Sequence, residues 1–298
     1  MSNKIKSETI YRIDHVPGEE ISPDQDLVGK QTYHVYNEAG HLILEIAYNR
    51  DGDIADKMEY RYDEDEKLLE TLIYGEDEEV LERKKIIWSD DNRILKETIY
   101  YLDGSEDIHE FFYNEKGNLT GIQAKDDEDE IEFSEKYFYE GEKVVKVEKW
   151  NGEDELIFKQ ENEYADNVLT TRTVWSSEEE EPFTVVQNFN ARGHREEERR
   201  YDSREKLIER NIYEEDENGR VIRMVEENRL RKNTTEFSYD DKGNVTYQKE
   251  TDLNGEINHE IRRYYGPDNE PVKTTVEMIA RPSMQKLAYT LIYRRELY

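Results

Sequence analysis

The chain has 298 residues, with 42 Lys and Arg against 73 Asp and Glu, a formal net charge of −31, and no cysteine. The lack of cysteine excludes disulfide frameworks and thiolate metal sites. No apolar run approaches the roughly 18 residues that a membrane-spanning helix needs, and the start, Met1 to Lys4, lacks the apolar segment of a secretory signal. We therefore expect a cytoplasmic protein that does not insert into membranes.

Hydrophobic residues make up 35% of the chain, which is below the roughly 45–50% typical of globular proteins. A thick, two-sided core is therefore not expected. The chain is nevertheless 11% aromatic, with 22 Tyr, whereas disordered acidic chains have few aromatic residues. We interpret it as a folded protein with a thin apolar layer.

Residues 1–31 precede the regular part of the chain and are interpreted as an N-terminal cap. They contain Pro17 and Pro23, and proline is common where a sheet edge must not pair further.

From Tyr11 onward, an aromatic residue recurs about every 25 residues. The positions are Tyr11, Tyr36, Tyr62, Trp88, Tyr113, Tyr139, Tyr164, Phe189, Tyr213, Tyr239 and Tyr265. A second aromatic often stands near the middle of the interval, at Tyr48, Tyr74, Tyr100, Trp150, Trp175 and Tyr201. Residues 32–272 are therefore predicted to form a tandem array of ~25-residue units, each made of two strands.

Each half-unit contains an aromatic, Asp or Asn, two polar residues, Gly, one further residue and an aliphatic, as in Tyr36 to Leu42. Asp or Asn suits the first position of a type I turn, and Gly supplies the positive φ of a three-residue hairpin loop. Positive φ is accordingly predicted for Gly40, Gly117 and Gly243. The aromatic and the aliphatic are predicted to face each other across the turn.

Other turns keep this frame with Glu66 or Glu205 in place of the glycine. Between turns the residues alternate, so that Met58, Tyr60 and Tyr62 should share one face of a strand. We expect strands of 7 to 8 residues, with one face of the sheet covered by aromatics and the other polar.

Turns every 12 to 13 residues leave no room for crossover helices, so neighbouring strands must be antiparallel. The predicted fold is all-β, a long antiparallel meander of about twenty strands. Strand pairs twist by roughly 20–25°, so such a sheet must coil, spiral or close. We expect a curved or spiralling, open, single-layer sheet in which each repeat contacts mainly its neighbours.

Residues 273–298 follow the regular array and are interpreted as a C-terminal cap. Pro282 lies in this segment, and the apolar run from Leu287 to Tyr293 is interpreted as a closing strand.

The recurring motif, seen in full from Tyr113 to Leu119 and from Tyr239 to Val245, resembles the YD repeat of RHS-type proteins. It is less similar to the MORN-like repeats, which also place glycine and tyrosine in β-hairpins. The resemblance covers roughly residues 32–272. In RHS proteins such repeats build a spiralling sheet around a toxin, but this chain is much shorter than a full shell, so the resemblance implies the fold rather than the enclosing role.

Histidines offer few candidate sites. His41 and His194 follow turn glycines, where other repeats have Lys, Arg or Asn, and a solvated turn residue is the favoured interpretation. His34 and His41 flank one hairpin, but two imidazoles without a third ligand do not make a metal site. No catalytic or nucleotide-binding motif is present. We predict no catalytic, cofactor-binding or metal-binding residues.

Two further features have alternative interpretations. The acidic runs 126–130 and 178–181 are interpreted as solvated loop tips rather than calcium sites, because they lack the spacing of calcium-binding loops. Trp88, Trp150 and Trp175 stand at the aromatic position of the repeat. Packing on the sheet is favoured for them over stacking against a ligand.

The functional hypothesis is a non-enzymatic scaffold or protein-binding module. The charge repels nucleic acids and anionic membranes and favours a basic protein partner. The alternative is an acidic neutraliser of a basic toxin, or a nucleic-acid mimic. An enzyme with a site in the concave face is the least supported hypothesis. Part of the acidity also serves solubility, because charge prevents sheet edges from pairing.

Overall fold

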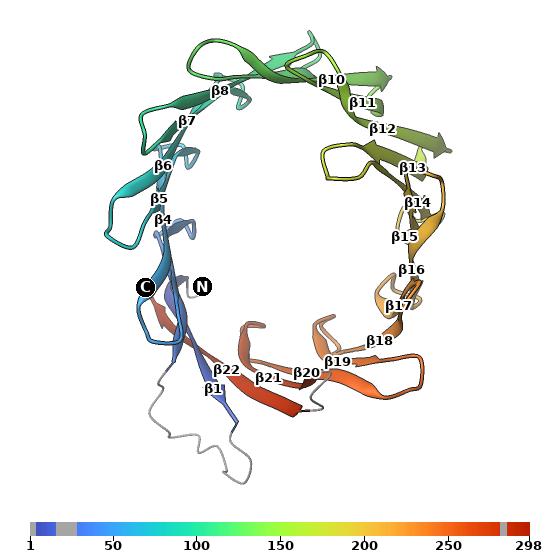
Figure 1. Ribbon diagram of the computed structural model, residues 1–298. Helices are drawn as coiled ribbons and strands as arrows, with labels where there is room; N and C mark the ends of the chain where they lie inside the picture. Colours follow the sequence, from blue (N-terminus) through green and yellow to red (C-terminus); the bar gives the residue numbers. More distant parts are fainter. Residues whose placement is uncertain (1–3, 16–28, 281–284) are drawn as a thin grey trace.

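The computed structural model describes residues 4–15, 29–280 and 285–298. These residues form one antiparallel sheet of 22 strands that curves into a ring (Figure 1). In chain order the strands are β1 (Ile5–Asp14), β2 (Lys30–Tyr36), β3 (Leu42–Tyr48), β4 (Ile54–Tyr62), β5 (Leu68–Tyr74), β6 (Val80–Trp88), β7 (Ile94–Tyr101), β8 (Glu106–Tyr113), β9 (Leu119–Lys125), β10 (Ile131–Glu140), β11 (Lys143–Asn151), β12 (Leu156–Ala165), β13 (Val168–Ser176), β14 (Phe183–Phe189), β15 (Arg195–Asp202), β16 (Leu207–Glu215), β17 (Val221–Asn228), β18 (Lys232–Tyr239), β19 (Val245–Thr251), β20 (Ile257–Tyr265), β21 (Pro271–Ala280) and β22 (Gln285–Leu297).

The hairpin turns have the predicted chemistry. The Asn37 side-chain oxygen accepts hydrogen bonds from the backbone N–H groups of Gly40 (3.0 Å) and His41 (2.9 Å). Positive φ is confirmed for Gly40 (100°), Gly117 (86°) and Gly243 (90°). Glu66 and Glu205 also have positive φ, at 65° and 59°.

The predicted strand register is also confirmed. Tyr62 pairs with Leu68 across its turn, and Tyr60 and Met58 pair with Thr71 and Ile73. The three β4 side chains therefore share one face, while the intervening residues of that strand lie on the other face.

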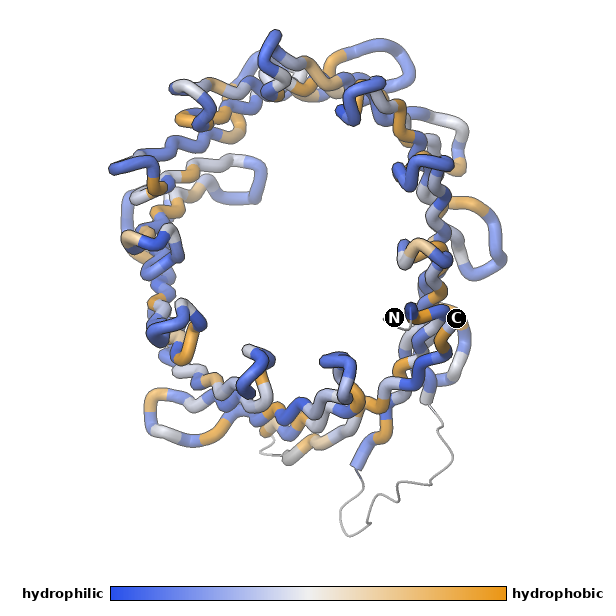
Figure 2. The backbone as a smooth tube through the Cα atoms, turned by 180° about the vertical axis from the view of Figure 1, so that it is seen from behind, coloured by the Kyte–Doolittle hydropathy of each residue, from blue (hydrophilic) through white to orange (hydrophobic). Residues whose placement is uncertain are grey.

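The sheet is closed, so the prediction of an open, curved or spiralling sheet is wrong. Strand β1 pairs with β2 on one side and with β22 on the other, and Ile10 is opposite both Thr32 and Tyr293. The Tyr298 amide donates to the Lys4 carbonyl at 3.1 Å, and the two chain ends lie together in Figures 1 and 2. The sheet carries enough strands to bring its first and last edges together, and closure satisfies hydrogen-bonding groups that an open edge would expose.

The terminal segments contribute the strands that meet at this junction. The predicted closing strand, Leu287 to Tyr293, lies within β22, which pairs with β1. Pro17, Pro23 and Pro282 lie outside the described residues.

The ring has no central core. With strands about 4.8 Å apart, 22 of them give a circumference of about 106 Å and a radius of at least about 17 Å, too wide for inward-pointing side chains to fill. Among the described residues the buried apolar side chains are few, namely Leu72, Ala124, Val147, Val225 and Val276. Backbone ladders and pairs of neighbouring side chains therefore supply most of the stability, in keeping with the low apolar content.

The two faces of the sheet differ in exposure. Side chains converge on the concave face of a closed sheet and diverge on the convex face. The most exposed side chains in the middle of strands, such as Arg61, Ile87, Phe112, Phe138 and Tyr264, fall on the face opposite Tyr62 when the register is followed around the ring. We therefore assign the face that carries Tyr62 as the inner face and the other as the outer face.

Aromatic residues occur on both faces, so the expectation of a single aromatic face is wrong. Tyr62 lies on the inner face, whereas Tyr74, which pairs with Lys57, lies on the outer face. The same alternation continues around the ring, because the two aromatics of each repeat unit stand on neighbouring antiparallel strands, at positions whose side chains point to opposite faces of the sheet. Each face thus has its own row of aromatics at its own end of the strands.

Candidate functional site

The ring has two rims with different contents. One, which we call the latch rim, holds the turns that follow even-numbered strands, together with residues 4 and 298. The other, which we call the far rim, holds the turns that follow odd-numbered strands. Figure 2 shows that the turns at both rims are mainly hydrophilic.

The latch rim is held together by aromatic side chains on the inner face. The Tyr62 hydroxyl in β4 donates to the Leu42 carbonyl in β3 at 3.0 Å, which joins two hairpins that no turn connects at this rim. The same contact recurs from Trp88 to Leu68, Tyr113 to Ile94, Tyr139 to Leu119, Tyr164 to Val144, Tyr239 to Val221 and Tyr265 to Val245. We call these contacts latches.

The series of latches is interrupted at β14, at β16, which ends in Glu215 rather than an aromatic, and at the ring junction. Phe189 has no hydroxyl group, so β14 cannot make the contact. At the ring junction, a charged group takes its place, because Arg295 donates to the Pro271 carbonyl at 2.8 Å. Arg295 also pairs with Glu8 of β1, and both side chains are only 13% exposed.

Burial raises the pKa of Tyr62, Tyr113, Tyr139 and Tyr239 above the ordinary value. The hydroxyls of these four latches therefore stay protonated and able to donate at neutral pH.

Aromatics at the far rim have a different role. The mid-interval aromatics of the repeat lie there on the outer face, and several have a cation above the ring: Lys30 lies 4.6 Å from the Tyr48 centroid, Lys57 4.4 Å from that of Tyr74, Lys85 5.4 Å from that of Tyr100 and Lys136 4.7 Å from that of Trp150. Such contacts are weak at exposed positions.

The tryptophans are thus divided between the two faces. The Trp88 indole donates to Leu68 at 2.8 Å, as one of the latches, and Trp150 lies beneath Lys136. Both side chains thus contact other residues of the sheet. Trp175 pairs with Lys159 and Thr184 on the outer face.

The net charge is concentrated outside the strands. The 22 strands hold 29 of the 42 Lys and Arg and 31 of the 73 Asp and Glu. This leaves 13 basic and 42 acidic residues in the rest of the chain, so the strands are nearly neutral and the connecting segments carry almost all of the net charge.

Within the strands, charges of opposite sign are paired on both faces. On the outer face, Glu70 is 7% exposed and pairs with both Arg61 (2.7 Å) and Arg83. On the same face, Glu197 accepts from Arg199 and Arg210, at 2.6 Å each. The two arginines hold the pKa of Glu197 below its usual value against the opposing effect of desolvation. On the inner face Glu8 pairs with Arg295.

Five consecutive turns of the far rim carry acidic residues and no Lys or Arg. They are residues 75–79, 102–105, 126–130, 152–155 and 177–182, and we call them the acidic arc. The predicted loop positions of the runs 126–130 and 178–181 are confirmed. Part of this charge is used locally, because Glu178 pairs with Lys149 and Glu179 with Arg200.

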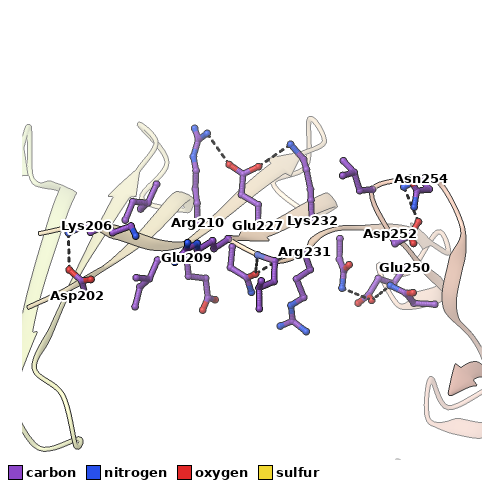
Figure 3. A pocket seen from close by; sticks show the side chains of 18 of the residues that line it. Asp202, Lys206, Glu209, Arg210, Glu227, Arg231, Lys232, Glu250, Asp252 and Asn254 are labelled. Atoms are coloured by element: carbon purple, nitrogen blue, oxygen red, sulfur yellow. Dashed lines mark hydrogen bonds and ion pairs between the residues drawn. The ribbon is translucent and has the colours of Figure 1, made fainter. Parts of the chain in front are cut away.

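A hollow of about 1170 Å³ lies next to the acidic arc, along strands β16 to β21 at the far rim. Basic residues line it at Lys206, Arg210, Arg229, Arg231 and Lys232, and we call it the basic hollow. Figure 3 shows Arg210 and Lys232 on either side of Glu227, at 3.5 and 2.9 Å from its carboxylate. Leu207, Leu230 and Leu253 add apolar surface.

The histidines lie apart from this hollow or make contacts of their own. His41, in a latch-rim turn, is 3.1 Å from Glu66 and stacks on Tyr62. His194 occupies an exposed turn position 2.9 Å from Glu215. His34 lies on the inner face between Glu8 and Glu45. In the described part of the chain, no group of three or more His, Cys, Asp or Glu is arranged to hold a metal ion.

No helix long and apolar enough to cross a membrane occurs within residues 4–15, 29–280 and 285–298.

No family model matches the chain, and no curated protein matches it. Among solved structures, it is similar to TcdB2-TccC3, at 13% identity and a TM-score of 0.35 over 84% of this chain, and to TcdB2-TccC3-Cdc42, at 14% and 0.31 over the same share. It spans only 16% and 15% of those chains. It is also similar to a porin-like protein from Bacteroides uniformis, at 10% identity and a TM-score of 0.32, over 98% of this chain and 96% of that one. Similarities this low do not assign a family or a function.

Proposed function

We propose that the protein is a non-enzymatic scaffold or protein-binding module, and that its acidic arc receives a basic protein partner. The supporting observation is the separation of charge. Strand charges are nearly balanced and paired, whereas the arc combines neighbouring carboxylates without a basic residue among them in its turns. Closely spaced like charges at the end of a rigid scaffold create a field that attracts cations and speeds the association of basic surfaces.

Acidic side chains of the arc that form no hydrogen bond or ion pair with another described residue allow a direct test. The probe is a fluorescent peptide of alternating Lys and Gly, and the measurement is its anisotropy at low and at physiological salt. The arc variant combines Glu76→Gln, Asp127→Asn, Glu128→Gln and Glu180→Gln. The matched control on the latch rim combines Glu38→Gln, Glu64→Gln, Asp90→Asn and Glu115→Gln. We expect about tenfold weaker binding for the arc variant and less than about twofold for the control. Equal weakening would show that total charge, rather than the arc, attracts the probe.

The second candidate is an acidic neutraliser of a basic toxin, or a nucleic-acid mimic. The arc supports it, since it is a continuous acidic segment of the rim. A mimic, however, needs carboxylates in a long stripe at phosphate-like spacing, and the paired charges on both faces of the strands favour the binding module. A partner captured through the arc and then displaced by double-stranded DNA would favour the mimic.

We also propose that the ring works in aqueous solvent, with the cytoplasm as the expected compartment. The outer face supports this, because Arg61, Glu70 and Arg83 form a charged cluster within the strands, where a barrel in a bilayer presents an apolar band. Fractionation of the native cell tests the proposal: recovery in the membrane pellet after a high-salt wash would contradict it.

A further inference from the structure

The far rim changes sign immediately after the acidic arc. The next two turns in chain order, after β15 and after β17, contain Arg204, Lys206, Arg229 and Arg231. Among the residues that the structure describes, no carboxylate is within ion-pair distance of Arg229 or Arg231, whereas Lys206 and Arg204 lie near Asp202, the pKa of which is lowered by a hydrogen bond from the Lys206 backbone and by their charges. Many cations of the strands, by contrast, are paired with carboxylates.

The acidic groups that line the same hollow are already engaged. Glu227 is held between Arg210 and Lys232. Glu250 accepts hydrogen bonds from the side-chain amides of Asn233 (2.9 Å) and Asn258 (2.8 Å). Asp202 accepts from the backbone of its own turn, at 2.9 Å from Lys206 N. Glu209 and Asp252 also accept hydrogen bonds, from the Asn211 side chain (3.1 Å) and from the backbone of Asn254 (2.9 Å). The hollow is thus lined by five acidic and five basic side chains, and within the described part of the chain its cations without an ion pair include Arg229 and Arg231.

Apolar side chains lie beside these cations. Leu230 is 93% exposed and Leu253 is 74% exposed, each in a turn of the far rim, and both line the hollow together with Leu207, which is 45% exposed. Most other turns of this rim have charged or small polar residues at their tips. Exposed leucines grouped at one hollow mark a contact surface.

We propose that the basic hollow binds an acidic peptide segment that carries apolar side chains, supplied by a partner protein. Carboxylates of the segment pair with Arg229, Arg231 and Lys206, while its apolar side chains cover Leu230 and Leu253. The volume, about 1170 Å³, exceeds the roughly 300–1,000 Å³ of small-molecule sites and suits a run of several residues. This site is separate from the acidic arc and takes the opposite charge.

A second copy of the chain fits less well. The arc of another copy offers carboxylates, but its turns have few apolar residues to cover the leucines. Two chains of net charge −31 also repel each other.

The test uses the full chain and a fluorescent peptide of about twelve residues that combines Glu, Asp and two Leu, a length that matches several residues of extended chain. Two comparison peptides are used: the same peptide with Leu replaced by Ser, and the same peptide with Glu and Asp replaced by Lys. The variants are Arg229→Glu with Arg231→Glu, and Leu230→Ser with Leu253→Ser. The matched control, Arg50→Glu with Lys116→Glu, makes the same charge change elsewhere on exposed turns.

We expect the acidic leucine peptide to bind the wild-type chain. Its affinity should be about tenfold lower for the Arg229→Glu with Arg231→Glu variant and several-fold lower for the Leu230→Ser with Leu253→Ser variant. Its affinity for the control should be within about twofold of the wild-type value. Circular dichroism confirms that the variants are folded. Equal losses in the charge-reversed hollow and the control, or equal binding of the serine peptide, would overturn the proposal. Sedimentation would also overturn it if the wild-type chain forms oligomers and the Arg229→Glu with Arg231→Glu variant is monomeric, because the hollow would then be a contact between copies.

Discussion

The two rims of the ring are built from the same repeat but are put to different uses. At the latch rim, an aromatic of one hairpin bonds to the backbone of its neighbour in seven strands, so most turns are tied to the next. At the far rim, the aromatics lie on the outer face beneath cations, and the turns vary in length and carry opposite charges in different sectors. The comparison indicates that one rim maintains closure, which leaves the other free to vary its surface.

The largest expected effect comes from removing many latches at once by pH. Burial raises the pKa of four latch tyrosines, Tyr62, Tyr113, Tyr139 and Tyr239, in the folded state, so their stabilisation is complete below the unfolded value of about 10 and is lost as pH rises through the folded values. A hydrogen bond to Asp107 raises the pKa of Tyr101 to about 12, with the same sign. Urea unfolding should therefore show a nearly constant stability up to about pH 9 and a falling one from about pH 10 upward. A constant midpoint would show that the latches contribute little.

The second effect concerns the junction that closes the latch rim. Arg295→Ala leaves Glu8 without its arginine partner and the Pro271 carbonyl without its donor, and we expect a loss of roughly 3 kcal/mol of unfolding free energy, as for other mostly buried ion pairs. The control is Arg294→Ala, which removes an exposed neighbouring cation. Denaturant unfolding compares the two. Equal midpoints would mean that the β1–β22 ladder alone keeps the ring closed.

The third effect compares one turn from each rim. Gly243 (φ 90°) and Gly255 (φ 80°) both have open space where a Cβ would be. Alanine should therefore cost about 1–2 kcal/mol at each through backbone strain alone. Glu205→Ala should be nearly neutral, since that turn already holds a side chain at positive φ.

Hydrogen exchange then distinguishes the rims. Because the ring is closed and latched, Gly243→Ala should increase exchange in the neighbouring hairpins as well, whereas the effect of Gly255→Ala should stay within its own hairpin. The same pattern for both glycines would remove the proposed difference between the rims.

The fourth effect is the loss of a single latch. Tyr139→Phe removes the 2.7 Å hydrogen bond to Leu119 and should cost about 0.5–1.5 kcal/mol. Tyr74→Phe, at the far rim, should cost less, since its ring keeps the contact with Lys57. Thermal melts of the two variants give the comparison, and a larger loss for Tyr74→Phe would reverse our assignment of the rims.

The smallest effect is a gain. Phe189→Tyr places a hydroxyl where the series of latches is interrupted, and the pattern of the other repeats puts the Leu169 carbonyl within its reach. We expect about 0.5 kcal/mol of added stability, measured as a higher denaturation midpoint. A decrease would show that the inner face at β14 cannot accommodate the hydroxyl.

Local structure followed from the sequence because each turn is specified by its own residues. Asn37 and Gly40 determine their hairpin, and Tyr62 and Leu68 determine their register. Closure could not be predicted in this way, because it depends on twist accumulated over the whole sheet and on Arg295, which lies outside the repeat pattern. Leu230 and Leu253 have no distinguishing pattern in the sequence, because only the fold brings their turns together at one hollow.

The adjacency of Lys4 and Tyr298 has a consequence for how the chain can be rearranged. In the folded ring these two residues are where a further latch-rim turn would stand, so a short Asn-Gly loop could join them and a new pair of termini could be opened at another turn. Circular permutants cut at far-rim turns should fold into the same ring, whereas those cut at latch-rim turns should lose the tie between neighbouring hairpins. The order of the strands along the chain would then matter less than their order around the circle.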